Sequence, residues 1–344
     1  KASDDCYFTL RATSLRPLQE FLGIPVTLTG TARLQGSFFE RERQLWVNAE
    51  VPQIAYGDQR AKALSLSLDN RADTSSLRLA GSATLLADDG TPYLASIGAT
   101  LKHDRMNSTI SWASSEADAF EGTLNAATTF STDARGKLRT DVAGQPASVI
   151  LNRTTWNLAP FAISAAAGRV DVNDFRFYSA DQHFSVDGVA SASASDTLRV
   201  SLDDANMEYL LSLITLPSVL QFGGKLSGEA IATSLLSERR AVAADISIAG
   251  LTFCHGPLGD ATTHVTMDDG RLAFRVAATD EAVSADVTTR VNGTVYLPAD
   301  SLDLVIDADG TDITFLSTML SGVLSDVSGN AYGRLRIGGP FRHL

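Results

Sequence analysis

The sequence predicts a mainly β fold, an elongated and curled antiparallel sheet accompanied by a few short amphipathic helices. Two observations carry this prediction. Apolar and polar residues alternate with a period of two along much of the chain, as in Ala63–Asp69, where three leucines fall on one face and serines on the other. Asp-Gly and Asn-Gly pairs, which tolerate the backbone of tight hairpins, recur between such runs.

The predicted strands share this strict alternation. They cover residues 63–69, 77–79, 108–112, 169–173, 183–187, 198–202, 245–248, 271–276 and 301–307. Hairpin turns are predicted at residues 88–90, 187–188, 268–270, 292–293 and 309–310. The polar positions of these strands are mostly small residues, which predicts a sheet that is covered on one face only.

Bulk composition excludes several classes of protein. The 344 residues carry a net charge of −12 without a dense Lys/Arg cluster, which argues against a nucleic-acid partner. No apolar run approaches the ~18 residues of a membrane-spanning helix. The first ten residues lack the pattern of a signal peptide, and we expect the chain to be an internal piece of a longer protein.

Three segments have helical periodicity, and each follows a residue suited to cap a helix. The caps are Ser14, Asn206 and Asp312, and they predict helices near 14–23 and 206–216 and a third after Asp312. An offset of 192 residues superimposes the first copy on the second, including its cap, its apolar spacing and a later proline and glycine. This agreement predicts an internal repeat.

The third copy follows the second at an offset of 106 residues in the helix and 105 beyond it. Gly224 and Gly228 thus correspond to Gly329 and Gly333. We therefore predict a β-rich module over 1–201, a second over 202–304 and the start of a truncated third over 305–344, together forming one continuous elongated domain. Duplication that only enlarges a closed barrel or sandwich is the alternative.

The order of motifs in the second half resembles a known family. Its motifs are Gly168–Phe175, Phe184–Ser191, Gly224–Gly228, Phe315–Gly322 and Ser328–Leu335. Together they resemble the TamB/AsmA-like envelope proteins, which include a subunit of the translocation and assembly module.

The resemblance implies a periplasmic repeating β-groove, or β-taco, in a full-length protein anchored in the inner membrane. Such grooves shelter phospholipid acyl chains between the membranes and support outer-membrane protein assembly with a TamA/BamA-like barrel partner. The expected function is therefore non-catalytic lipid transport without a cofactor. The expected groove lining consists of the apolar positions of the predicted strands: Leu64, Leu66, Leu68, Ile110, Trp112, Val170, Val172, Phe184, Val186, Leu198, Val200, Ile246, Ile248, Leu272, Phe274, Leu302 and Leu304.

Two other functions remain open from the sequence. A secreted carbohydrate-active or adhesive β-solenoid would pair carboxylates such as Asp203 and Asp268 across a cleft. A scaffold for barrel assembly would instead bind client strands by β-augmentation. We interpret most carboxylates as solvated turn residues, since they lie beside glycine or asparagine.

No metal site is expected, because the five histidines lack metal-ligand spacing. Cys6 and Cys254 are too few for a disulfide framework and are interpreted as two separate buried thiols, with a bond between them in an oxidising compartment as the alternative. Trp46, Trp112 and Trp156 are expected in the core or the groove lining, because each lies in an alternating stretch.

Overall fold

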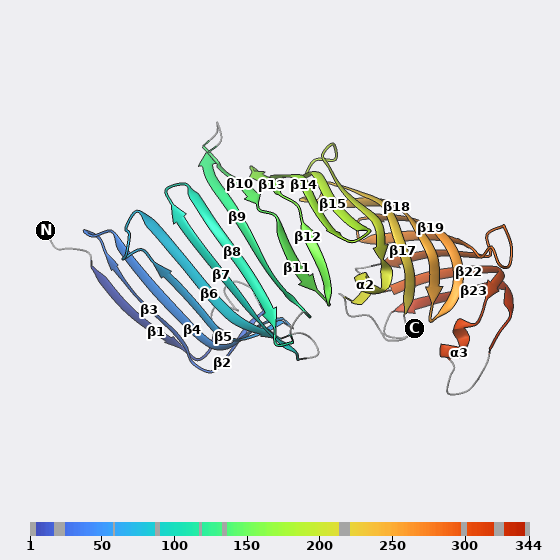
Figure 1. Ribbon diagram of the computed structural model, residues 1–344, viewed down its shortest axis with the longest axis horizontal. Coiled ribbons are helices and arrows are strands. Elements are labelled where there is room, and N and C mark those ends of the chain that lie inside the picture. Colours follow the sequence, from blue (N-terminus) through green and yellow to red (C-terminus); the bar gives the residue numbers. More distant parts are fainter. Residues whose placement is uncertain are drawn as a thin grey trace. The chain divides into compact units, whose positions relative to one another are not determined.

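Strands dominate the computed structural model, as Figure 1 shows. The structure describes residues 5–16, 25–57, 59–86, 90–116, 119–132, 136–212, 221–296, 301–319 and 327–340. Within these residues, 23 strands form a long antiparallel sheet and two short helices accompany it. The prediction of a mainly β, antiparallel fold with short helices is confirmed, and every predicted strand lies within an observed one.

Backbone contacts divide the chain into two units, residues 1–166 and 167–344. The module boundary expected between residues 201 and 202 falls inside the second unit.

The first unit contains the strands that Figure 1 colours from blue to green. They are β1 (Cys6–Ala12), β2 (Val26–Thr29), β3 (Ala32–Phe39), β4 (Gln44–Tyr56), β5 (Gln59–Asp69), β6 (Ser76–Leu86), β7 (Pro92–Lys102), β8 (Arg105–Ser114), β9 (Glu121–Thr132), β10 (Leu138–Gly144), β11 (Ala147–Leu151), β12 (Thr154–Leu158) and β13 (Phe161–Ala166). From β3 to β10 each strand pairs with the next, while β1 pairs with β3 and β2 with β4.

The second unit is a meander in which each strand pairs with the next. Its elements are β14 (Arg169–Ser179), β15 (Gln182–Ser191), β16 (Thr197–Asn206), α2 (Met207–Ser212), β17 (Phe222–Thr233), β18 (Ala241–Phe253), β19 (Gly256–Asp268), β20 (Arg271–Thr279), β21 (Thr289–Tyr296), β22 (Ser301–Asp312), α3 (Phe315–Met319) and β23 (Asn330–Pro340). Strand β19 also approaches β22, although β20 and β21 lie between them in the sheet, so the sheet curls within this unit.

The predicted repeat can be followed in the strand pairing. In β16 and β17, Leu202 lies opposite Gly228, and beyond a bulge Asn206 lies opposite Lys225. Adding 106 to the first residue of each pair and 105 to the second gives the observed partners in β22 and β23, Ala308 with Gly333 and Asp312 with Asn330. The two copies therefore share their register and the position of the bulge.

The predicted caps also appear. The Asn206 Oδ1 atom accepts from Tyr209 N at 2.6 Å, and Asp312 Oδ1 accepts from Thr314 N at 2.6 Å. In the first copy Ser14 Oγ accepts from Arg16 N at 3.2 Å, but most of the helix predicted near 14–23 lies outside the described residues. The Asn206 cap therefore ties the first turn of α2, whereas the Asp312 bond reaches Thr314, the residue just before α3.

Three of the predicted hairpin turns are wrong. Gly188, Gly293 and Gly310 lie inside β15, β21 and β22, whereas the turn at 268–270 joins β19 to β20 as predicted. Gly188 faces a bulge at Asp174, and Gly310 (φ +95°) forms the bulge of β22. Glycine inside a strand often marks such a bulge rather than a chain reversal.

The turn predicted at residues 88–90 lies mostly outside the described residues.

Several glycines within strands make room for an aromatic ring on the neighbouring strand. A Cβ atom at Gly36 would lie 2.6 Å from Phe8 Cζ, and one at Gly122 would lie 2.5 Å from Trp112 Cζ2. Gly293, predicted to lie in a turn, is crowded by the ring of Phe274 in the same way. Close packing explains why glycine occupies these strand positions.

Candidate functional site

One face of the first unit is a continuous apolar surface. Cross-strand partners point to the same side of a sheet. The pairing registers therefore define one row of side chains that crosses eight strands, namely β1 and then β3 to β9. In this order, the row contains Leu10, Leu34, Ala49, Leu66, Gly81, Ile97, Ile110 and Leu124.

The side chains of this row remain accessible to solvent. Leu10 is 57% exposed, Leu66 40%, Ile97 39% and Ile110 47%. An isolated exposed leucine is ordinary, but a contiguous apolar patch on a sheet is typical of a binding surface.

The opposite face of the first unit is polar. Ser65 and Ser82 hydroxyls lie 2.9 Å apart, those of Ser96 and Ser111 lie 2.7 Å apart, and Thr109 donates to Asn125 at 2.7 Å. These cross-strand pairs satisfy one another and present hydroxyl and amide groups to water. The sheet therefore has one wet face and one apolar face, as its alternation predicts.

The accessible surface of the whole chain is consistent with an incompletely covered sheet. It amounts to 20919 Å². Two compact proteins, each of half the 36.5 kDa mass, would together expose about 16,000 Å². Only 13 apolar residues in the described parts of the chain are buried, so little of the apolar face is sealed inside a closed core.

All 17 residues expected to line a groove lie on the apolar face of their unit. Leu66 and Ile110 are exposed and Ile248 is buried, with 8% of its surface exposed. The other 14 are half-buried. Sequence reasoning missed Leu10, Leu34 and Ile97, although Ile97 lies four residues before Leu101 in the same period of two.

In the second unit, the apolar face is covered at one end of the strands. Met207 of α2 packs with Ile248, Leu251, Ala261 and Ala278 in the hydrophobic cluster of this unit. The helices lie at that end of the strands, and the ring of Phe315 in α3 lies 5.4 Å from that of Phe253. A small core therefore closes one end of an otherwise half-buried surface.

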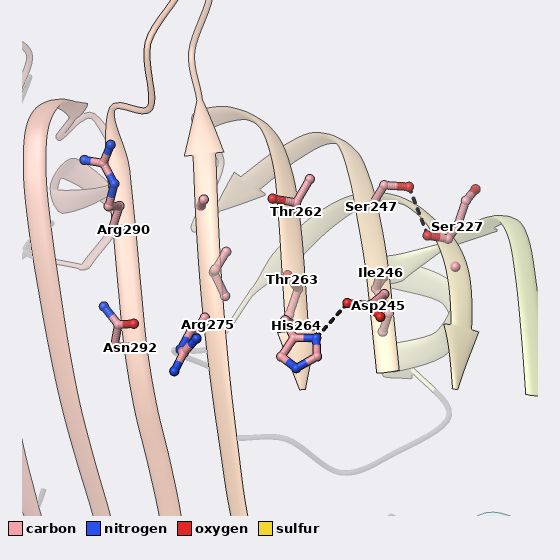
Figure 2. A pocket seen from close by; sticks show the side chains of 13 residues that line it. Ser227, Asp245, Ile246, Ser247, Thr262, Thr263, His264, Arg275, Arg290 and Asn292 are labelled. Carbon is pink, nitrogen blue, oxygen red and sulfur yellow. Dashed lines mark hydrogen bonds and ion pairs between the residues drawn. The ribbon is translucent and has the colours of Figure 1, made fainter. Parts of the chain in front are cut away.

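The polar face of the second unit carries an open recess of about 630 Å³, shown in Figure 2. His264 Nδ1 lies 2.6 Å from Asp245 Oδ1 across β18 and β19. The Ser247 hydroxyl donates to the carbonyl of Ser227 at 3.0 Å rather than to His264. These residues therefore do not form the hydroxyl–imidazole–carboxylate relay of a nucleophilic serine.

Ion pairs lie on the polar faces of both units, within strand β10 in the first unit and between β22 and β23 in the second. In the first unit, hydrogen bonds from Arg139 and then Ser164 lower the pKa of Asp141 to about 2. In the second, the guanidinium group of Arg336 lowers the pKa of Asp303. These groups are exposed, so the two ion pairs contribute little to the stability of the fold.

The tryptophans have separate environments. Trp156 is buried and Trp112 is half-buried on the apolar face, as expected. The prediction is wrong for Trp46, which shares the polar face with Asp69 and lies beneath the guanidinium of Arg71 at 4.9 Å. The cation covers the ring, so Trp46 needs no apolar neighbours.

Cys6 and Cys254 are both free thiols; Cys254 is buried as expected, but the expectation is wrong for Cys6, which is exposed. No group of three or more potential metal ligands occurs within the described residues. None of the helices in those parts of the chain has the length and apolarity needed to cross a membrane.

Comparisons with protein-family models, curated proteins and solved structures gave no match.

Proposed function

We propose that this chain is a non-catalytic segment of a periplasmic envelope protein and that it shields lipid acyl chains on its apolar sheet face. The uncovered apolar row of the first unit carries the proposal. The motif resemblance to TamB/AsmA-like proteins extends it to phospholipid transport between the membranes. It also suggests a role in outer-membrane protein assembly, with a TamA/BamA-like barrel as partner and an inner-membrane anchor in the full-length protein.

The dimensions of the apolar row support this proposal. Eight strands, spaced about 4.8 Å apart, give a row about 34 Å long. One leaflet of a bilayer has a hydrocarbon thickness of about 15 Å, half of the ~30 Å core. The row is thus long enough to cover an acyl chain along its whole length.

The energetics also favour acyl chains as the ligand. Each buried methylene contributes about 0.8 kcal/mol, so covering half of the surface of about a dozen methylenes gives about 5 kcal/mol. The face offers little else to a ligand, since its side chains are mostly leucine, isoleucine, valine and alanine. A polar ligand would gain few hydrogen bonds there.

The proposal is tested by uptake of a fluorescent phospholipid from vesicles. Leu66→Asp puts a charge in the middle of the exposed row and should reduce uptake at least tenfold, because the carboxylate would lose hydration beside an acyl chain. Ser67→Asp is the matched control, since Ser67 is the next residue and points to the polar face. It should take up lipid as the wild type does.

Equal uptake by folded Leu66→Asp and Ser67→Asp proteins would contradict the proposal. Hydrolysis of a glycan, together with the absence of lipid uptake, would favour the carbohydrate-active alternative.

A further inference from the structure

The two ends of the strands in the second unit differ in how completely the apolar face is covered. Strands β16 and β22 run the same way, because six successive antiparallel pairings, from β16–β17 to β21–β22, link them. The helices α2 and α3 follow these two strands, so both helices lie at the same ends of the strands. We call these ends the helix edge and the opposite ends the open edge.

At the helix edge, the apolar face is sealed. The row of cross-strand partners Ile248, Ala261, Ala278 and Thr289 has exposed fractions of 8%, 4%, 1% and 6%. Met207 packs against this row from α2. No acyl chain could reach water past these side chains without displacing them.

At the open edge, the same face is not sealed. The corresponding row near the other ends of the strands contains Val242, Met267, Leu272, Val295 and Leu302. All five are half-buried. Because the strands are continuous between the two rows, the apolar face leads from an accessible end to a closed one.

Charge distinguishes the two edges as well. Asp203, Asp204 and Glu208 surround the start of α2, with Lys225 Nζ 3.7 Å from Asp204, and Asp309 and Asp312 precede α3. At the described turns of the open edge, arginines offset the carboxylates. In the turn before β18, Arg239 and Arg240 follow Glu238, and in the turn before β20, Arg271 follows Asp268 and Asp269. A phosphate group is therefore repelled more at the helix edge, within the screening distance of about 8–10 Å.

We infer that phospholipid enters the second unit at the open edge, with its acyl chains pointing towards α2 and its headgroup outside. This inference rests on the proposed function. Ala261 and Met267 lie six residues apart on β19, or about 20 Å. One leaflet's hydrocarbon is about 15 Å thick, so a chain that enters beside Met267 ends near the sealed row.

Spin-labelled lipids test this orientation. The full chain is mixed with phosphatidylcholine that carries a nitroxide either on the headgroup or at the end of an acyl chain, and amide signals are recorded by NMR. The headgroup label should broaden the signals of Arg271 and Ala273 several-fold more than those of Ala261 and Ala278. The acyl-terminal label should give the reverse pattern.

The outcomes separate the two claims. Broadening from both labels with the reverse pattern, or evenly at both edges, would overturn the orientation while leaving lipid binding intact. If neither label broadened any signal, lipid binding in this unit would be overturned, and the proposed orientation with it.

A pair of variants tests entry at the open edge independently. Leu272→Asp places a charge on the apolar face at that edge, and it should abolish broadening of Ala278 by the acyl-terminal label. Ala273→Asp is the control, because Ala273 points to the polar face opposite Thr294. It should keep the wild-type pattern, and unchanged broadening in a folded Leu272→Asp protein would contradict entry at this edge.

Discussion

The two units have the same alternating pattern but differ in how much of their apolar faces is buried. In the first, a row across eight strands leaves Leu66 and Ile110 40% and 47% exposed. In the second, the sheet curls, α2 packs onto it, and Ile248 is only 8% exposed. Alternation therefore determines which face is apolar, whereas curling and the helices determine how much of that face is sealed.

The largest expected difference between the units lies in core stability. Ile248→Ala should lower the free energy of unfolding by about 2–5 kcal/mol, because it leaves a cavity in a packed cluster. Ile110→Ala in the first unit should cost less than about 1 kcal/mol, because the side chain is already half in water. Urea unfolding followed by circular dichroism measures both, and equal losses would contradict the contrast between a sealed and an open face.

The next largest effect on stability is expected from replacing glycines that lie under aromatic rings by alanine. Gly122→Ala should destabilise the protein by about 1–3 kcal/mol, because its Cβ would meet Trp112. Gly98→Ala is the control, since no atom lies within 4 Å of its Cβ position, and it should be neutral or stabilising. Thermal unfolding compares the two, and similar midpoints would show that Trp112 adjusts without cost.

Removal of the helix cap should have a smaller effect. Asn206→Ala deletes the acceptor for Tyr209 N and should cost about 1 kcal/mol. Because α2 covers the sealed row, amide exchange of Ala261 and Ala278 should accelerate as well. Asn107→Ala, on an exposed strand position, is the control, and unchanged exchange in the Asn206 variant would contradict a covering role for α2.

The smallest effect concerns acid sensitivity of the first unit. The folded-state pKa of Asp141 is about 2, below its ordinary value of 3.8. Its stabilising contribution is therefore complete above pH 3.8 and is lost as the pH falls towards about 2. Asp141→Asn should melt below the wild type at pH 6 and equal it near pH 2. A gap in melting temperature that persists at low pH would contradict this linkage.

The sequence was a good guide to strands and repeats, because both depend on local spacing. The alternation at Ala63–Asp69 places Leu64, Leu66 and Leu68 on the apolar face of β5, as expected. The offset between Asn206 and Asp312 reappears in the pairing of β16 and β22 with their partners.

The sequence was a poor guide wherever the outcome depended on a distant neighbour. Gly293 follows an asparagine and predicts a turn, but the ring of Phe274 on the neighbouring strand β20 leaves no room for a Cβ atom there. The spacing of Trp46 is that of an apolar core position, yet Arg71 covers its ring from the turn that follows β5. The sealed row around Ala278 arises from the curl that brings β19 towards β22, which no local pattern encodes.

Organic extraction of the purified protein, followed by mass spectrometry, tests the central claim most directly. An open apolar face that carries acyl chains predicts phospholipid at a roughly molar ratio to protein, and much less of it in Leu66→Asp. An extract without lipid, from protein that also takes up none from vesicles, would contradict the claim.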